Sequence, residues 1–273
     1  MKSIFFSFTK ELVLSFWSAV AFVSVYYLVT DKPLVTIDAI KLGCFVMMAL
    51  LIISMIVSFI LIHRIRKEDA RISRILSEEG VTPEVLRYSL RKVESAEDRY
   101  EKAEAQLALA SCLSEGGYYD RCFETLAEIS FADLSETARE EYFNIYVYTN
   151  LFLGDLTAAQ EIYERTYMFF DRAKQRCRPM AVLHTLGVLE YAKANYILAE
   201  SYFLQAKAAA NDRMSLCECE MFLSLCYMNT NRPEKAVSAA KEAAALSSTV
   251  YQRRYIEGLR RSLLLRIGGC ERA

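Results

Sequence analysis

Two long apolar runs dominate the N-terminal part of the chain. The first extends from Leu12 to Thr30 and the second from Leu42 to Ile62, and neither contains a charged residue. Each is long enough to cross a hydrocarbon core of about 30 Å as an α-helix. One central Lys, Arg or Asp would cost about 2.5 to 3.5 kcal/mol, so the lack of charge favours insertion. The pattern therefore predicts a transmembrane helical hairpin over residues 1–62, with spans at about 12–30 and 42–62.

The flanking charges predict how such a hairpin would be oriented. The loop between the runs balances Lys32 and Lys41 against Asp31 and Asp38, whereas basic residues gather directly after the second run. The positive-inside rule then places everything after residue 62 in the cytoplasm, and an even number of spans places the N-terminus there too. We therefore expect an integral protein of a bacterial cytoplasmic membrane with two spans and both termini cytoplasmic.

A basic amphipathic segment follows the second run. Arg64, Lys67, Arg71 and Arg74 are three or four residues apart, which places them along one face of a helix. A basic stripe beside a bilayer attracts anionic headgroups at about 1 kcal/mol per charge. These four residues are therefore candidate anionic-lipid ligands, and a stop-transfer flank with solvated arginines is the alternative. Residues 63–95 are expected to form this helix and a short joint.

Residues 96–250 carry a repeated pattern of large and small apolar positions. In the copy that starts at Met180, Leu186 and Gly187 occupy positions 7 and 8, and Ala199 and Phe203 occupy positions 20 and 24. Small residues at positions 8 and 20 let two helices cross closely, and the larger residues fill the space around the crossing. Related copies start near Ala103, Glu140, Met180 and Cys217.

These positions resemble the tetratricopeptide repeat (TPR), a helix-turn-helix unit of about 34 residues. One hairpin cannot bury its apolar face alone, so such units stack into a solenoid. The resemblance implies an all-α fold with a TPR-like α-solenoid of about four repeats, and residues 251–273 are expected to form a capping helix and tail. The second copy departs from the pattern because Val147 replaces the small residue at position 8. A non-repeating helical bundle is the alternative.

The resemblance also indicates where a partner would bind. In TPR arrays the first helix of each repeat lines a groove through positions 2, 5, 9, 12 and 13. In the second, third and fourth copies many of these side chains are aromatic residues, Met or Leu, which suit an apolar helix face or an extended peptide. The first copy is more polar, with Glu104, Ser111 and Ser114. Burial against neighbouring helices, or cover by residues 80–95, is the alternative. The candidate groove residues are Asn144, Tyr148, Leu151, Phe152, His184, Val188, Tyr191, Met221, Leu225 and Met228.

One ligand class known for the family is disfavoured by these positions. Chaperone-binding TPR proteins hold a C-terminal carboxylate with Lys or Arg at position 5 and Asn at position 6 or 9. Here position 5 holds Leu107, Asn144, His184 and Met221, so the cationic part of that clamp is missing.

Composition excludes several other classes. The formal net charge is −1, which gives no global field for nucleic acid. The eight cysteines form no Cys-x-x-Cys pair, and we interpret them as free thiols in a reducing compartment. The chain has only two histidines, His63 and His184, and no phosphate-binding loop or nucleophile elbow. We therefore expect no catalytic, cofactor-binding or metal site.

Together these patterns predict a membrane-anchored, non-catalytic TPR scaffold that binds a protein or peptide partner and also contacts the bilayer. Two alternatives remain open. One is a structural or assembly subunit of a larger membrane complex or oligomer, and the other is a peptide-responsive signalling sensor. The family fold does not choose among them.

Overall fold

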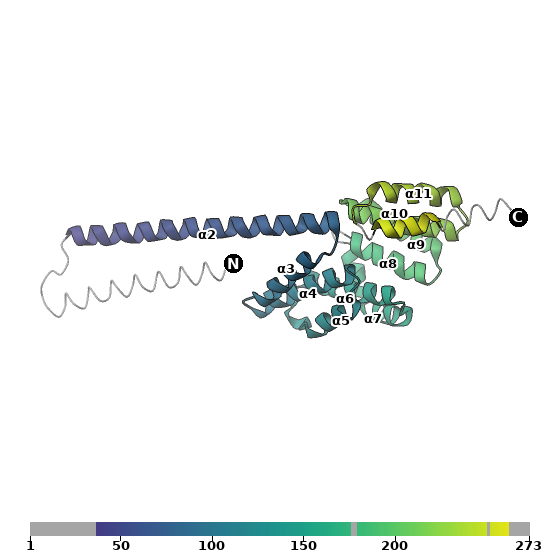
Figure 1. The fold of residues 1–273 in the computed structure, drawn as a ribbon. Coiled ribbons are helices and arrows are strands. Elements are labelled where there is room, and N and C mark those ends of the chain that lie inside the picture. The colour runs from purple at the N-terminus through teal and green to yellow at the C-terminus, as the bar shows by residue number, and fades with distance from the viewer. Residues whose placement is uncertain (1–36, 176–178, 250–251, 262–273) are drawn as a thin grey trace. The chain divides into compact units, whose positions relative to one another are not determined.

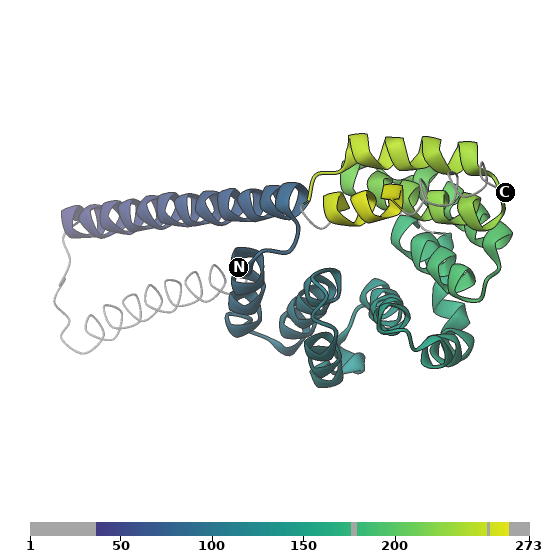
Figure 2. The ribbon, with the colours of Figure 1, turned by 45° about the vertical axis from the view of Figure 1, so that its right-hand side comes forward.

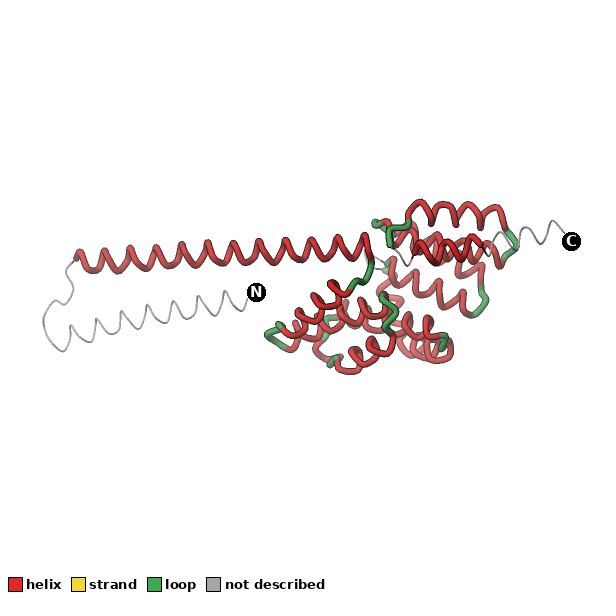
Figure 3. The backbone as a smooth tube through the Cα atoms, in the orientation of Figure 1, coloured by secondary structure: helices red, strands yellow, loops and turns green. Residues whose placement is uncertain are grey.

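The structure is a computed structural model that describes residues 37–175, 179–249 and 252–261. Within these ranges the regular elements are all helical, and no strand is present (Figure 3). The chain divides into two compact units, Met1–Arg71 and Ile72–Ala273, and each is considered by itself. The limits of the predicted domains remain predictions.

Helix α2 (Ile37–Glu79) is one continuous helix of 43 residues. It contains the second predicted span, 42–62, but it does not end with the apolar run and continues through the charged residues of 63–79. Among the described residues, no helix combines the length and the apolar character that crossing a membrane requires. The prediction of an integral membrane protein with two spans is therefore wrong. The first predicted span, 12–30, lies outside the described residues.

The Ile72–Ala273 unit is an array of helix hairpins. Within this unit, neighbouring helices pack as antiparallel pairs (Figures 1 and 2), and each pair packs on the next. This arrangement confirms the predicted all-α, TPR-like solenoid. The pairs are α4 (Arg99–Glu115) with α5 (Tyr119–Glu128), α6 (Glu136–Leu153) with α7 (Leu156–Lys174), α8 (Met180–Ala192) with α9 (Tyr196–Ala209), and α10 (Arg213–Asn229) with α11 (Pro233–Leu246).

Shorter elements complete the array at its ends and between pairs. Helix α3 (Pro83–Glu94) packs on α4, and a 3₁₀ turn, η1 (Phe131–Asp133), precedes α6. Residues 252–261 form a further helix after α11, and its Ile256 and Leu259 pack into the apolar clusters of the last pair. This segment therefore packs on the last helix pair, and a capping role for residues 251–273 remains a prediction.

Local sequence signals set the helix starts. The carboxylate of Asp98 accepts hydrogen bonds of 2.8 Å from the backbone N–H groups of Tyr100 and Glu101 at the start of α4. Asp212 caps α10 in the same way through Ser215 N, also at 2.8 Å. Such caps satisfy amide groups that have no partner inside the helix. Gly154 ends α6 with φ +82°, a conformation that favours glycine.

The crossing of α8 and α9 shows why the repeat needs small residues. Phe203 is fully buried, and its ring lies directly against Gly187 and stacks on Phe222 with ring centroids 5.0 Å apart. A Cβ atom built on Gly187 would lie 2.6 Å from Cε1 of Phe203. Ala199, also fully buried, belongs to the same apolar cluster. The absence of a side chain at residue 187 therefore determines how closely these helices approach.

Replacing Gly187 with alanine is expected to destabilise the protein by about 1 kcal/mol. Alanine gains up to about 1 kcal/mol of helix propensity, but forcing a methyl group into a filled core costs about 1 to 3 kcal/mol. Gly258→Ala is the matched control, because a Cβ at that helical position meets nothing within 4 Å. Urea unfolding should separate the two variants. A Gly187→Ala protein that gains stability as Gly258→Ala does would contradict this account of the crossing.

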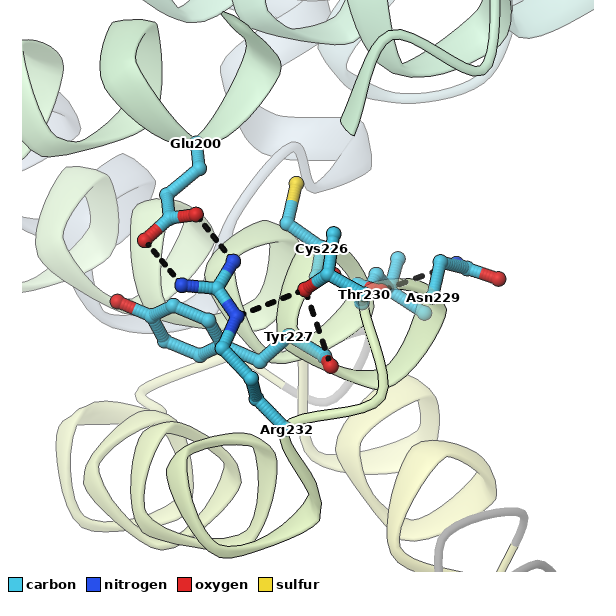
Figure 4. Close-up of polar contacts among 7 residues, drawn as sticks. Glu200, Cys226, Tyr227, Asn229, Thr230 and Arg232 are labelled. Carbon is cyan, nitrogen blue, oxygen red and sulfur yellow. Dashed lines mark hydrogen bonds and ion pairs between the residues drawn. The ribbon is translucent and has the colours of Figure 1, made fainter. Parts of the chain in front are cut away.

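A bidentate ion pair links the third and fourth helix pairs (Figure 4). Arg232 donates from Nη1 to Glu200 Oε1 at 3.0 Å and from Nη2 to Glu200 Oε2. Its Nε donates to Thr230 Oγ1 at 2.9 Å, and its guanidinium lies 4.8 Å from the centroid of the Tyr227 ring. Two parallel N–H···O bonds fix direction as well as distance. This contact therefore sets the orientation of α9 relative to the turn before α11.

Candidate functional site

A cavity of about 590 Å³ lies on the inner face of the helix array. Its wall is built from α4, α6, α8 and α10, the first helix of each pair, together with residues from both ends of the unit. This volume lies within the range of ordinary ligand pockets. The repeats thus bring side chains that are distant in sequence to one site.

The two ends of the array meet beside this cavity. Ser248 Oγ donates to the carbonyl oxygen of Ser77 at 3.1 Å, across 171 residues of sequence. A Cβ on Gly80 would lie 3.3 Å from Cγ2 of Thr249, and Gln252 Nε2 donates to the carbonyl oxygen of Met214 at 3.3 Å. Gly80, Thr249 and Gln252 all line the cavity. The sequence indicated only a short joint near residue 80, whereas the structure makes this segment part of the cavity wall.

The wall is acidic. Among its described residues are five glutamates and no Lys or Arg. Since the whole chain has a net charge of only −1, this acidity is local. The five residues are Glu79, Glu115, Glu140, Glu141 and Glu218.

Burial makes ionisation of three of these carboxyl groups unfavourable. Burial raises the pKa of Glu218 to about 8, and the negative charges of Glu115 and Asp212 add to the shift. Burial also raises the pKa of Glu115 and of Glu141. Both of these side chains line the cavity and remain partly open to solvent, so their shifts are smaller in effect than that of Glu218. The cavity therefore disfavours the negative charges that its own residues carry.

Two polar atoms on the cavity wall lack partners. Within the described part of the chain, neither Nε2 of His184 nor Oδ1 of Asn144 has a hydrogen-bond partner, although both atoms are buried. His184 is 4% exposed, and burial lowers its pKa to about 4, so its imidazole is neutral at pH 7. Its ring lies 6.1 Å from that of Tyr148 between centroids. A buried polar atom without a partner costs free energy, and neither of these atoms is accessible to solvent.

The structure places four of the predicted groove residues on the cavity wall. Asn144, Tyr148 and Phe152 come from α6, and His184 comes from α8. The rings of Tyr148 and Phe152 are 4.5 Å apart between centroids. Partner binding by these residues remains a prediction.

The other predicted groove residues lie elsewhere. Val188 is buried in the cluster around Phe203, and Leu151 and Tyr191 pack against that cluster. Met221, Leu225 and Met228 pack in the clusters that contain Ile256 and Leu259 of the C-terminal helix. The C-terminal helix thus occupies the inner face of the fourth repeat, so these positions do not contribute to the cavity.

The sequence interpretation omitted the acidic residues of the site. Glu141 and Glu218 stand at position 2 of the second and fourth copies, and Glu115 stands at position 13 of the first. Both positions belong to the groove set, and position 2 is Glu in three of the four copies because Glu104 also occupies it. Reading charge as well as apolar character at these positions would have identified the acidic wall.

The remaining predicted sites are placed as follows. Arg64, Lys67, Arg71 and Arg74 all lie on α2 with exposed side chains, and lipid binding by them stays a prediction. Over residues 37–175, 179–249 and 252–261, no three His, Cys, Asp or Glu side chains are close enough to hold a metal ion. The described cysteines, among them the fully buried Cys122 and Cys226, are free thiols.

Comparison with known proteins identifies the repeat array. No curated protein matches the chain. A family model, the SusR N-terminal TPR domain, matches residues 85–248, which run from α3 to just beyond α11. TPR domains are typically non-catalytic modules for protein–protein interaction, so the match favours an interaction scaffold. Because the matched segment covers more than half of the sequence, the chain belongs to the family of the SusR N-terminal TPR domain.

Proposed function

We propose that this protein is a non-catalytic scaffold that captures a peptide segment of a partner protein in the cavity of its TPR unit. The observation that carries the proposal is the convergence of Asn144, Tyr148, Phe152 and His184 on one cavity of about 590 Å³. These residues come from the first helices of two repeats, the surface through which TPR arrays bind peptides. The cavity therefore combines the position and the size that a short peptide segment needs.

The chemistry of the wall also suits a peptide. The neighbouring rings of Tyr148 and Phe152 offer an apolar surface to a side chain or to a stretch of backbone. Asn144, a partly exposed residue of the wall, carries a side-chain amide group that can form a hydrogen bond with a peptide. Apolar contact supplies affinity, and the polar atom fixes the orientation of the ligand.

A peptide-responsive sensor is the second candidate, and the contact between Ser248 and Ser77 favours it. Both ends of the array line the cavity, through Gly80 at one end and Gln252 at the other. A ligand that touches both ends would stabilise the closed arrangement by its differential affinity for that state. Capture and response would then use the same cavity.

Site-specific photo-crosslinking in the cells that produce the protein tests capture. A benzoylphenylalanine residue at position 148 should form covalent adducts with a defined peptide segment of a partner, identified by mass spectrometry. The same residue at position 167, where the native Tyr167 is 58% exposed and outside the cavity, is the control.

Two results would separate the alternatives. Adducts that form at position 148 and disappear when Phe152 is replaced by alanine would support the cavity as the binding surface. Adducts that form at position 167 and never at 148, in a folded protein, would place partner contact on the outer surface and overturn the proposal.

A further inference from the structure

The hydrogen bond that joins the two ends of the array has a second acceptor within reach. Ser248 Oγ lies 3.1 Å from the carbonyl oxygen of Ser77 and 3.5 Å from Oε1 of Gln252. A hydroxyl group carries one proton, so it donates to only one of these oxygen atoms at a time. When Ser248 separates from Ser77, its hydroxyl group can therefore turn to Gln252 and keep a partner.

The carbonyl group of Ser77 also loses little when this contact breaks. Ser77 is an exposed residue in the last turn of α2, where backbone carbonyl groups have no partner inside the helix. Water can take the place of the Ser248 hydroxyl group there. Separation of the two ends therefore leaves no buried polar group unsatisfied at this bond, so that cost does not oppose opening.

The side chain of Thr249 makes two separate contacts. Its Oγ1 accepts a hydrogen bond of 3.1 Å from the backbone N–H group of Gln252, at the start of the C-terminal helix. Its Cγ2 methyl group lies toward Gly80, 3.3 Å from the position that a Cβ atom on that residue would take. The hydroxyl group thus holds the helix start in either arrangement of the ends, whereas the methyl contact exists only when the ends meet.

Gln252 connects this contact to the cavity wall. The residue is 1% exposed, and its Oε1 accepts hydrogen bonds from the backbone N–H groups of Ser248 at 3.2 Å and Thr249 at 3.4 Å. Its Nε2 donates to the carbonyl oxygen of Met214 in the first turn of α10, at 3.3 Å. A ligand in the cavity can contact both sides of the contact between the ends, because its lining includes Gly80, Met214, Thr249 and Gln252.

We infer that Ser248 and Thr249 form a latch that closes on the end of α2, opens when the Ser248 hydroxyl group turns to Gln252, and in its closed state retains the peptide in the cavity. The last part of this inference rests on the proposed function, whereas the two states of the latch need no ligand. A ligand that contacts Gly80 on one side and Gln252 on the other binds the closed state more tightly and shifts the populations toward it. Occupancy of the cavity would then fix the last turn of α2.

Double electron–electron resonance on the full chain tests the latch without any ligand. Spin labels are attached through azidophenylalanine at positions 102 and 241, because the native cysteines would compete for thiol-directed labels. Lys102 on α4 and Lys241 on α11 are exposed, and neither lines the cavity. We expect two distance populations in the otherwise unchanged protein, a major one for the closed latch and a minor, longer one for the open latch.

Substitutions that remove the contacts of the closed state should favour the open state. The double variant Ser248→Ala, Thr249→Ser loses the hydroxyl donor and the methyl group but keeps the Oγ that accepts from Gln252. Its longer-distance population is expected to increase about threefold to tenfold, the factor for one net hydrogen bond and one methyl contact. Ser247→Ala is the matched control and should leave the distances unchanged, because Ser247 Oγ donates locally to the carbonyl oxygen of Ala244 at 2.9 Å.

A disulfide bond provides the opposite test. A Cβ atom on Gly80 would lie 3.6 Å from Cβ of Thr249, within the range found between disulfide-bonded cysteines. The oxidised variant Gly80→Cys, Thr249→Cys should lose the longer-distance population, and reduction of the same protein should restore it. Both forms carry a side chain at residue 80 with φ +80°, so their comparison isolates the effect of the bond.

The outcomes separate the latch from peptide capture. A single distance population that is the same in the unchanged protein, the double variant and the oxidised protein, all folded by circular dichroism, would overturn the latch. The peptide that crosslinking at position 148 identifies should deplete the longer-distance population when it is added to the labelled protein. Distances that respond to the variants but not to this peptide would overturn the link between latch and cavity. If crosslinking identifies no peptide, capture is overturned, and the distances alone decide for or against the latch.

Discussion

Replacing Phe203 with alanine is expected to lower the free energy of unfolding by about 3 to 5 kcal/mol. The ring is fully buried where α8 and α9 cross, against Gly187 and stacked on Phe222. Its removal leaves a void between rigid helices, and the loss combines the transfer of the ring with the cost of the cavity. Urea unfolding followed by circular dichroism measures the change.

The neighbouring residue provides the control for this substitution. Leu204 lies next along α9 and is 45% exposed, so Leu204→Ala is expected to change stability by only about 0.5 kcal/mol. A double-mutant cycle adds a second check, because the methyl group of Gly187→Ala should cost nothing once the ring is absent. If Phe203→Ala and Leu204→Ala proved equally mild, the described core around residue 203 would be wrong.

Glu218→Gln is expected to make stability less dependent on pH. The folded protein holds the Glu218 proton up to a pKa of about 8, whereas an unfolded glutamate releases it near 4.5. The contribution of Glu218 to stability is therefore present below pH 4.5 and is lost as the pH rises to 8. The variant should match the wild type near pH 5 and exceed it by roughly 2 to 3 kcal/mol at pH 8.5, after allowance for water in the cavity.

His184, the other buried titratable group discussed above, does not produce this pH-dependent difference in stability between the wild type and Glu218→Gln. Burial lowers the pKa of His184 to about 4, so His184 costs stability as the pH falls from 6.5 to 4, but it does so equally in both proteins. Glu124→Gln, at an exposed position outside the cavity, serves as the surface control. A stability difference between wild type and Glu218→Gln that stays constant from pH 5 to 8.5 would show that Glu218 ionises normally in the folded state. The other titratable side chains that the structure describes on the cavity wall are Glu79, Glu115, Glu140, Glu141, Tyr119 and Tyr148, and Asp212 also acts on Glu218.

The helix pairs could be predicted from sequence because their cause is local. Gly187 and Ala199 occur at the spacing at which two adjacent helices must approach, and that spacing recurs along the chain. The structure of residues 42–62 could not be predicted in the same way. The apolar run indicated a separate spanning helix, whereas it forms one part of α2, which continues into a charged segment.

The site was only partly predictable because it depends on contacts between distant residues. The repeat register correctly placed Asn144, Tyr148, Phe152 and His184 on the face that forms the cavity. The register could not show that helix 252–261 would cover Leu225 and Met228, since nothing in the repeat specifies how the array ends. Nor could it show that Gly80 would meet Thr249.

The contact between Ser77 and Ser248 changes the order in which parts of this array are expected to unfold. In an open solenoid each repeat touches only its neighbours, so the terminal repeats fray first and amide exchange slows toward the middle. Here the two ends contact each other, so local unfolding of one end removes contacts from the other and exposes it to solvent. Hydrogen exchange should therefore show matched protection at the two ends instead of a gradient, and deleting residues 252–261 should speed exchange in α3 as well as in α11.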